Sequence, residues 1–518
     1  MQHRPRLNLG GVRGDAIKEH STSTASDDGE LMRQCLLIFA LAVSAWASTP
    51  CGWHNDVTVH VPTTNYPTPF TPPAVGASYT DATGCEPTRI TNALADGHGG
   101  EHVVYNIFTL TSADDKYAFG NVSGGSFEVR SLISGNVGQV IVPIANTPIF
   151  LGTAFKWAGP NGTGSALSDH DFYWFDATSG TDTVLKVGTV NDTGSCAPSC
   201  TISNIRTLHT FTGFGSNNSC NLEFAGGEGD ISDDGNIGVF DNDPGSGSCS
   251  AVHTYLWTYN FSTNTVIAQL DYTSLATRLP NGASVFHDNR ILVNWNTNTG
   301  TPSCPTGPDC YSGSEVYSTN LAFSEQLTPY AAHYVTGWYG SSVYYISMAN
   351  SSNFNSTCSG NQGTVVMDID TLTKYCSLKL NLQSGQNQSG SVSSKNGWVL
   401  TYLVDDRTVP NTASYPLAGT WQTMWGPYEN ELVLQSLAPS HDTYRVVQTR
   451  TCNTRADYWK NPFGSLSRDA TLLLYNTDFC QNSTTGYSDM MLINLYGGAG
   501  GAGAVTVSGV KMQGVVAH

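Results

Sequence analysis

The chain has 518 residues, enough for one large domain or for two to three smaller ones. Charged residues make up only 12 % of it, while glycine (53 residues) and tyrosine (24 residues) are abundant, a composition that favours strands and turns over helices. The net charge of -18 argues against nucleic acid or an anionic membrane surface as a partner. We therefore expect an all-β protein with almost no helix.

Residues 32–47 have the pattern of a secretory signal. Arg33 gives a basic start, the apolar run that follows is too short to span a bilayer, and Ala45 and Ala47 flank a small-x-small cleavage position. A polar stretch precedes this segment, so we interpret Met32 as the translation start; a cytoplasmic leader before a single membrane anchor is the alternative. We predict that residues 1–47 are leader and signal peptide, and that the mature protein is secreted or periplasmic and not membrane-bound.

The cysteines indicate disulfides. Twelve of the thirteen lie beyond residue 47, and an even number in an exported chain favours disulfides over metal-binding thiolates. Although sequence alone leaves the connectivity open, pairing of neighbours predicts Cys51 with Cys85, Cys196 with Cys200, Cys220 with Cys249, Cys304 with Cys310, Cys358 with Cys376, and Cys452 with Cys480. No second Cys or His pair stands near Cys196 and Cys200, so zinc is not predicted there.

Residues 48–88 are rich in proline and threonine and predict an extended arm pinned by Cys51 and Cys85. From there to residue 496 one pattern recurs: a small or apolar strand, a short polar turn, and a strongly apolar strand. Its copies are residues 108–119, 229–240, 283–294, 334–345, 390–401 and 464–475. The first gap is two units wide, and a degenerate copy around 148–157 and 172–176 fills it.

Each unit also carries a second pair of strands, as at residues 363–370 and 374–380. Four antiparallel strands repeated about every fifty residues are typical of a propeller blade, because radial packing covers both faces of a sheet that could not cover them alone. We predict an all-β fold, a seven-bladed β-propeller of four-stranded antiparallel blades over residues 89–496, closed by a strand near 88–92. A solenoid or two β-sandwiches are the alternatives.

The Ser-x-Asp-Gly turn at residues 232–235 resembles the repeat of TolB-type (WD40-like) propellers, and six units carry a related pattern. Secreted polysaccharide lyases such as the oligogalacturonate lyases share that architecture. In those lyases a His-x-His-Pro pattern precedes the last innermost strand and its histidines hold a metal. Here Lys460, Asn461 and Pro462 stand in that place, so the resemblance implies the fold and an activity on polysaccharide, without that metal site.

In such propellers the loops before each innermost strand share one face with the loops between the second and third strands. That face, here called the loop face, collects His98, His102 and Tyr105 before the first repeat. Before the last repeat it collects five further candidates: Arg450, Arg455, Tyr458, Trp459 and Lys460. Five of the eighteen Lys and Arg residues beyond residue 47 fall within residues 445–468; solvated edge charges are the alternative interpretation.

This mixture of side chains suits β-elimination on a uronate sugar. A cation neutralises the carboxylate, a His or Tyr removes the α-proton, and another donates a proton to the leaving oxygen. The hypothesis assigns proton transfer to His98, His102, Tyr105 or Tyr458, and substrate binding to Arg450, Arg455, Trp459 and Lys460. The two histidines could instead serve a turn or packing, and Trp459 could plug the contact between the last and first blades.

No cofactor is predicted. A structural calcium site at Asp233, Asp234, Asp241 and Asp243 is one interpretation of those residues, and capping of turn amides by the first two is the other.

Two functions follow: a metal-independent polysaccharide lyase acting on an acidic glycan, or a non-catalytic propeller that binds glycan or protein outside the cell. We expect a monomer. Residues 497–518 form a Gly-rich tail in which residues 504–511 alternate like one more strand, to pair with a blade edge or with another chain.

Overall fold

The computed structural model describes residues 49–58, 60, 70–102, 109–122, 126–148, 155–159, 169–176, 180–192, 196–214, 222–224, 230–242, 254–273, 280–295, 311–330, 333–349, 354, 356–359, 363–379, 388–405, 428, 430–451, 461–479 and 488–497. The side chains of residues 102, 388–392 and 403–405 are not among the described groups. Pro50–His518 form one compact unit.

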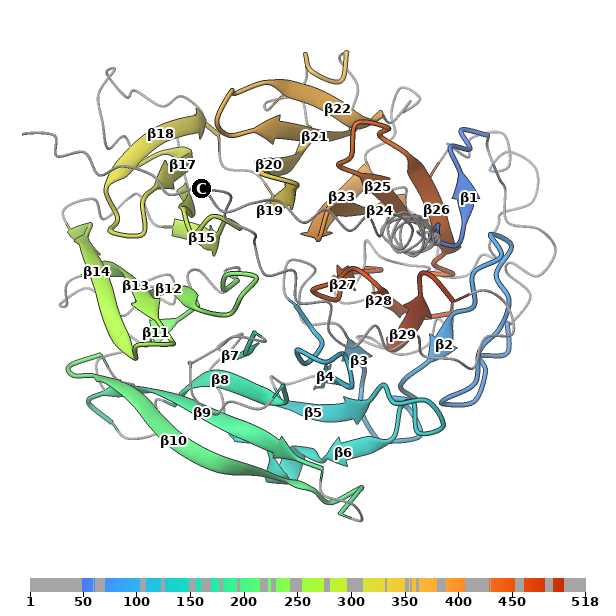
Figure 1. The fold of residues 1–518 in the computed structure, drawn as a ribbon. Coiled ribbons are helices and arrows are strands. Elements are labelled where there is room, and N and C mark those ends of the chain that lie inside the picture. The colour runs from blue at the N-terminus through green and yellow to red at the C-terminus, as the bar shows by residue number, and fades with distance from the viewer. Residues whose placement is uncertain are drawn as a thin grey trace, which may run out of the picture. The chain divides into compact units, whose positions relative to one another are not determined.

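Seven antiparallel sheets surround a common axis in this unit (Figure 1). From the innermost strand outward, blade 1 is β3 (Glu101–His102), β4 (Tyr117–Val122), β5 (Ser126–Ser131) and β6 (Val140–Val142); blade 2 is β7 (Phe155–Trp157), β8 (Asp171–Asp176), β9 (Thr183–Asn191) and β10 (Thr201–Phe211). Blade 3 is β11 (Leu222–Glu223), β12 (Ile237–Asn242), β13 (Tyr255–Asn260) and β14 (Thr265–Asp271); blade 4 is β15 (Pro280–Val285), β16 (Ile291–Trp295), β17 (Gly313–Tyr317) and β18 (Phe323–Thr328).

Blade 5 is β19 (Tyr334–Tyr339), β20 (Ser342–Ala349), β21 (Gly363–Asp368) and β22 (Lys374–Lys379); blade 6 is β23 (Gln388–Lys395), β24 (Trp398–Asp405), β25 (Glu431–Ser436), β26 (Thr443–Gln448) and an outer β1 (Trp53–His54). Blade 7 is β27 (Gly464–Leu466), β28 (Leu472–Thr477), β29 (Asp489–Asn494) and β2 (Thr88–Arg89). Within the described residues the helical content is one 3-10 turn, η1 (Ile144–Asn146), and no helix there is long and apolar enough to cross a bilayer. The predicted seven-bladed, four-stranded fold is confirmed.

The ring closes as predicted, because β2 from the start of the propeller pairs with β29 from its end. Thr88 lies opposite Leu492 and Arg89 opposite Met491. The degenerate copy that the spacing required is blade 2. The sequence did not predict β1, which pairs Trp53 with Arg445 and makes blade 6 five-stranded.

The Ser-x-Asp turn is a hydrogen-bonded cap between the first and second strands of a blade. In blade 3 the Ser232 hydroxyl donates to Asp234 Oδ1 (2.6 Å) and accepts the amide of Ile237 (2.8 Å), while Asp234 Oδ1 accepts the amide of Asn236 (3.0 Å). The pairs Ser112 with Asp114 and Ser467 with Asp469 repeat this arrangement in blades 1 and 7. Gly235 is required in blade 3, since its φ is +74° and a Cβ would lie 2.3 Å from the Gly159 nitrogen.

The buried apolar side chains form clusters that extend across neighbouring blades. One cluster joins blades 2 and 3 through Phe175 and Phe240, another joins blades 3 and 4 through Val239 and Val293, and a third joins blades 4 and 5 through Val316 and Tyr345. The blades therefore bury each other's faces, as the repeat predicted.

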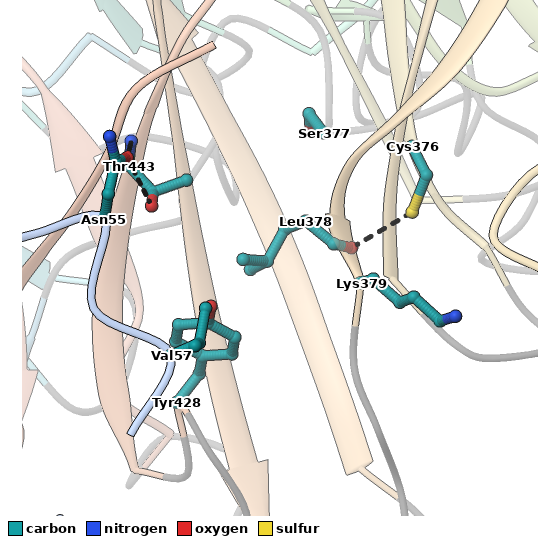
Figure 2. A pocket seen from close by; sticks show the side chains of 8 residues that line it. All are labelled: Asn55, Val57, Cys376, Ser377, Leu378, Lys379, Tyr428 and Thr443. Carbon is teal, nitrogen blue, oxygen red and sulfur yellow. Dashed lines mark hydrogen bonds between the residues drawn. The ribbon is translucent and has the colours of Figure 1, made fainter. Parts of the chain in front are cut away.

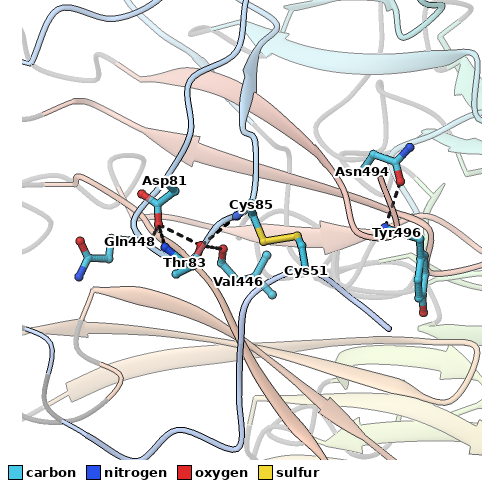
Figure 3. Close-up of a disulfide and its surroundings, with 8 residues drawn as sticks. All are labelled: Cys51, Asp81, Thr83, Cys85, Val446, Gln448, Asn494 and Tyr496. Carbon is cyan, nitrogen blue, oxygen red and sulfur yellow. Dashed lines mark hydrogen bonds between the residues drawn. A yellow bond between two sulfur atoms is a disulfide. The ribbon is translucent and has the colours of Figure 1, made fainter. Parts of the chain in front are cut away.

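Three predicted disulfides are confirmed: Cys51–Cys85, Cys196–Cys200 and Cys358–Cys376. Figure 3 shows the first of them beside Thr83, whose hydroxyl donates to the Val446 carbonyl of blade 6 (2.6 Å). The arm is therefore tied to itself and to the ring. The other three predicted pairs lie outside the described residues.

Candidate functional site

The predicted site is only partly within the described residues. His98 and Arg450 are described with their side chains, and His102 with its backbone. Five further candidates lie outside the described residues: Tyr105, Arg455, Tyr458, Trp459 and Lys460. The site can therefore be built from His98 and from Arg450, which have different surroundings.

His98 lies in the segment that runs from the outer strand of blade 7 to the innermost strand of blade 1. The Ala93 amide donates to Asp489 Oδ1 (2.9 Å), the His98 amide to the Ala93 carbonyl (2.7 Å), and the Glu101 amide to the Ser488 carbonyl (2.9 Å). Since residue 488 directly precedes β29, this segment lies at the end of the ring where β28 connects to β29. His98 is thus held at the seam between the first and last blades.

The His98 side chain is 16 % exposed, and its Nδ1 lies 3.8 Å from Oε2 of the fully buried Glu101. Interaction with the Glu101 carboxylate raises the pKa of His98, although burial opposes the shift. Glu101 fits because Gly120 lies beneath it, where a Cβ would come within 2.1 Å of Glu101 Oε1. The imidazole therefore carries its positive charge to higher pH than a free histidine does.

Arg130 of β5 lies at the centre of the charges beneath His98. Its Nε donates to Glu101 Oε1 (2.7 Å), and its Nη2 donates to Glu101 Oε2 (2.6 Å) and to Asp96 Oδ2 (2.8 Å). Glu128 contacts the same Nη2. Three carboxyl groups thus meet a nitrogen that carries two hydrogens.

Protonation of Glu128 resolves this excess of acceptors. Burial and the neighbouring Glu101 charge raise the pKa of Glu128 to about 8. Burial alone would also raise the pKa of Glu101, but His98 and Arg130 lower it. With Glu128 neutral, the Arg130 guanidinium faces one buried carboxylate, that of Glu101.

Three of these residues offer ligand atoms to a metal ion. One atom each from His98, Glu101 and Glu128 lies within 4.8 Å of the others. The Arg130 guanidinium already contacts both carboxyl groups, so a metal would have to displace a buried cation. The residues as arranged do not fit a metal site.

Arg450 has a different environment. Its guanidinium lies 4.3 Å from the Phe70 ring centroid and 5.2 Å from that of Tyr79, and Nη2 is 3.7 Å from Asp81 Oδ1. All three contacts are with residues 48–88, and the Arg450 side chain is 12 % exposed. Burial raises the pKa of Asp81 in spite of this arginine. Arg450 therefore anchors the predicted arm to the ring.

The described part of the basic cluster at residues 445–468 binds the chain itself. Arg445 Nε and Nη2 donate to both oxygens of Glu431 (2.6 and 2.7 Å). Arg468 Nη1 donates to the Asp233 carbonyl (2.9 Å) and Nη2 to the Trp157 carbonyl (3.0 Å), so blade 7 reaches blades 2 and 3 near the axis. Arg445, Arg450 and Arg468 are thus engaged within the ring.

The acidic residues considered for calcium also have partners in the chain. Asp234 caps the turn as the alternative interpretation predicted, and Asp233 Oδ2 lies 3.2 Å from His287 Nδ1. Asp233 Oδ1 is also 3.8 Å from Lys395 Nζ. Asp241 is buried on β12, and Asp243 lies outside the described residues. A calcium ion at the turn would compete with these contacts.

Sequence reasoning missed Glu101 as a partner of His98, and missed Glu128 and Arg130 altogether. A signal was available in the strand at residues 126–131. Glu128 and Arg130 stand two positions apart in that strand, so their side chains point to the same face, and charged residues are scarce in this chain. Opposite charges on one buried face indicate an internal ion pair.

No family model matches the chain, and no curated protein matches it. Among solved structures, an oligogalacturonate lyase from Vibrio parahaemolyticus is 10 % identical, covers 86 % of this chain and 98 % of its own, and has a TM-score of 0.46. The propeller domain of the Trilobed protease from Pyrococcus furiosus is 9 % identical over 73 % of this chain and 89 % of its own (TM-score 0.37), and RRP9 WD40 repeats are 11 % identical over 81 % and 99 % (TM-score 0.37). These proteins are too distant to bear on function.

Proposed function

We propose that the protein acts on an acidic polysaccharide outside the cell, by β-elimination at the loop face, with His98 as the group that gives a proton to the leaving oxygen. The observation that carries this proposal is the partly exposed His98 imidazole, 3.8 Å from the buried Glu101 carboxylate. Nδ1 is the ring nitrogen nearer the Glu101 carboxylate, which leaves Nε2 to meet a ligand.

Elimination requires two proton transfers. A base removes the proton α to the uronate carboxylate, the bond from the β-carbon to the glycosidic oxygen breaks, and that oxygen takes a proton. His98 suits the donor role, because interaction with the Glu101 carboxylate raises its pKa and so favours the protonated imidazole. The base is then His102, Tyr105 or Tyr458, and Arg455 and Lys460 neutralise the carboxylate while Trp459 supports a sugar ring.

The predicted pH dependence of the rate follows from the raised pKa of His98. A donor must be protonated, so the rate is retained below the raised pKa of His98 and falls as the pH rises through it. A base with an ordinary imidazole pKa would lower the rate at acidic pH, because a base must be deprotonated to act.

A non-catalytic propeller that binds glycan or protein is the second candidate. It is favoured by the internal engagement of Arg130 and Arg450, which already contact the carboxyl groups of Glu101 and Asp81. Neither guanidinium is available to neutralise a substrate without breaking a buried contact, so the lyase proposal depends on Arg455 and Lys460 for the cation that elimination needs.

The test is the ultraviolet absorbance of the unsaturated product during incubation with a panel of uronate polysaccharides. We expect His98→Gln to lower turnover about 100-fold or more, the usual contribution of a positioned acid. The exposed His441→Gln is the matched control and should leave the rate unchanged. No absorbance change with any uronate, together with glycan-array binding that His98→Gln leaves intact, would exclude the lyase and favour the binding propeller.

A further inference from the structure

A hollow of about 450 Å³ lies between the outer parts of blades 5 and 6 (Figure 2). One wall is β22 of blade 5. The other side includes Asn55 and Val57, which follow β1, together with Tyr428 and Thr443 of blade 6. Its size is in the range of ligand-binding sites in proteins.

The wall formed by β22 is a sheet edge. The strand order of blade 5 ends at β22, and within the described residues no further strand pairs with it. Four consecutive residues, 376–379, line the hollow, so the strand's backbone borders it. Cys376 is bonded to Cys358, which fixes this strand to the preceding loop. Backbone N–H and C=O groups at such an edge can pair with an added strand.

The neighbouring blade already uses this mode of addition. In blade 6, β1 pairs with β26 as a fifth strand, with Trp53 opposite Arg445 and His54 opposite Tyr444. The Asn55 amide continues the pairing to the Thr443 carbonyl (2.8 Å). The periphery of the ring therefore accepts a fifth strand at the radius of β22.

Apolar side chains form the floor of the hollow and part of its rim, beside the polar Asn55, Ser377 and Thr443. Leu378 and Tyr428 are buried beneath it in one cluster. Val57 at the rim is 72 % exposed, the most exposed large apolar side chain among the described residues. A side chain laid against Val57 would remove its exposed apolar surface from water, which favours binding.

The charge of the hollow differs from that of the chain. Among the described residues that line it, Lys379 is the only charged one, whereas the chain carries a net charge of -18. An acidic ligand would meet attraction from Lys379 here and repulsion over most of the remaining surface. Apolar floor, strand edge and lysine together suit an extended peptide with alternating apolar and acidic side chains.

We propose that the hollow between β22 and the segment after β1 docks an extended acidic peptide of a partner protein, added to blade 5 as a fifth strand. Alternate side chains of the peptide point at Leu378 and Val57, and an acidic one pairs with Lys379. This docking site is independent of elimination at the loop face, so either proposal can fail without the other.

The test is selection of a random dodecapeptide phage library on the full-length protein, followed by affinity measurement of the enriched peptides. We expect enriched sequences that alternate acidic and β-branched residues. Val57→Asp and Lys379→Glu should each weaken binding about tenfold or more, through the lost apolar contact and the reversed charge. Both positions are exposed, so neither change threatens folding.

Two matched controls belong to the same hairpin but do not line the hollow: Leu372→Asp and Lys374→Glu, both at exposed positions. Each should change affinity less than about twofold, as exposed substitutions outside a contact do. Strand addition also predicts that N-methylation of alternate peptide residues abolishes binding and that methylation of the residues between does not. Three results would each overturn the proposal. The first is failure to enrich any peptide family, the second is binding that Val57→Asp leaves unaffected, and the third is that the hollow binds oligogalacturonate in place of peptide.

Discussion

The two sides of the ring are held together by different chemistry. Blades 6, 7 and 1, with the segment at residues 49–89, contain buried arginine–carboxylate pairs. Arg89 with Asp489, Arg130 with Glu101, and Arg445 with Glu431 each approach to 2.6 Å. Blades 2 and 3 meet through aromatic rings, as where Phe175 of blade 2 lies 5.0 Å from Phe240 and 5.2 Å from Phe224 of blade 3, measured between ring centroids.

The difference follows from the connectivity. Between blades 2 and 3 the chain runs on from one sheet to the next, so apolar packing is enough to fix their contact. The closing side also joins segments far apart in sequence. Arg89 donates to Asp489, and Arg445 donates to the Thr58 carbonyl as well as to Glu431 of its own blade, whereas Arg130 and Glu101 pair inside blade 1. Buried ion pairs add little net stability, yet they admit few alternative arrangements, which suits a seam that must form in one register.

Breaking a buried pair on the closing side should have the largest effect. Arg445 is 1 % exposed and Glu431 is fully buried, so Arg445→Met leaves an unpaired buried carboxyl group. We expect a loss of about 3–5 kcal/mol in the free energy of unfolding, measured by urea titration. The partly exposed Arg290, paired with Asp288 and Asp370, is the control, and Arg290→Met should cost less than about 1 kcal/mol.

The double variant Arg445→Met with Glu431→Leu refines this test. Removing both charges should restore most of the lost stability, because no carboxyl group is then left unpaired. A double variant as unstable as Arg445→Met would mean that the arginine acts through packing against Trp53 and Tyr428 instead.

The disulfides compare the two sides directly. Cys51–Cys85 closes a separation of 34 residues on the closing side, and Cys196–Cys200 closes one of 4 residues in blade 2. Loop-closure entropy predicts a loss of about 4 kcal/mol for the Cys51→Ser, Cys85→Ser variant and about 2 kcal/mol for the Cys196→Ser, Cys200→Ser variant. Thermal unfolding of both variants measures the two losses of stability. Equal losses would contradict the explanation by loop length.

The closing side should also respond to pH. Asp115 of blade 1 lies beside Asp469 of blade 7, and burial and that second carboxylate raise the pKa of Asp115 to about 7. Asp114 also opposes its ionisation, while the Thr111 hydroxyl, which donates to Asp115 Oδ1 (2.6 Å), favours it. The folded state therefore binds the Asp115 proton more tightly than the unfolded state does.

Stability from this group is complete below about pH 4, the ordinary carboxyl value, and is lost as the pH rises through about 7. The isosteric Asp115→Asn should remove that slope and make the protein more stable than the wild type at alkaline pH, by on the order of 2–4 kcal/mol. Urea unfolding across the pH range measures the free energy of unfolding of the variant and the wild type, with Asp370→Asn at an exposed position as the control. Parallel slopes for Asp115→Asn and the wild type would contradict the prediction, because they would show that the pKa of Asp115 is not raised in the folded protein.

The sequence predicted the ring far better than it predicted the site. Blade number, the closing strand near residue 88 and three disulfides followed from local patterns: a repeated turn, an apolar strand and neighbouring cysteines. The partners of His98 did not, because Glu101 and Arg130 meet only when β3 and β5 join one sheet across Gly120. The clustering of arginines at residues 445–468 indicated a ligand, yet Arg445 and Arg450 bind Glu431 and Asp81 of the same chain.

The smallest predicted effect comes from the aromatic side. Phe240 is fully buried, and Phe240→Leu keeps an apolar side chain while losing ring contacts with Phe175 and Phe224. We expect a loss of about 1–2 kcal/mol in the free energy of unfolding. Because those partners carry no charge, the loss should not change with pH or salt, whereas that of Arg445→Met should shrink where Glu431 is protonated. A pH-dependent loss for Phe240→Leu would show that the aromatic contact is coupled to the charged seam, and the two sides of the ring would then have to be treated as one cooperative network.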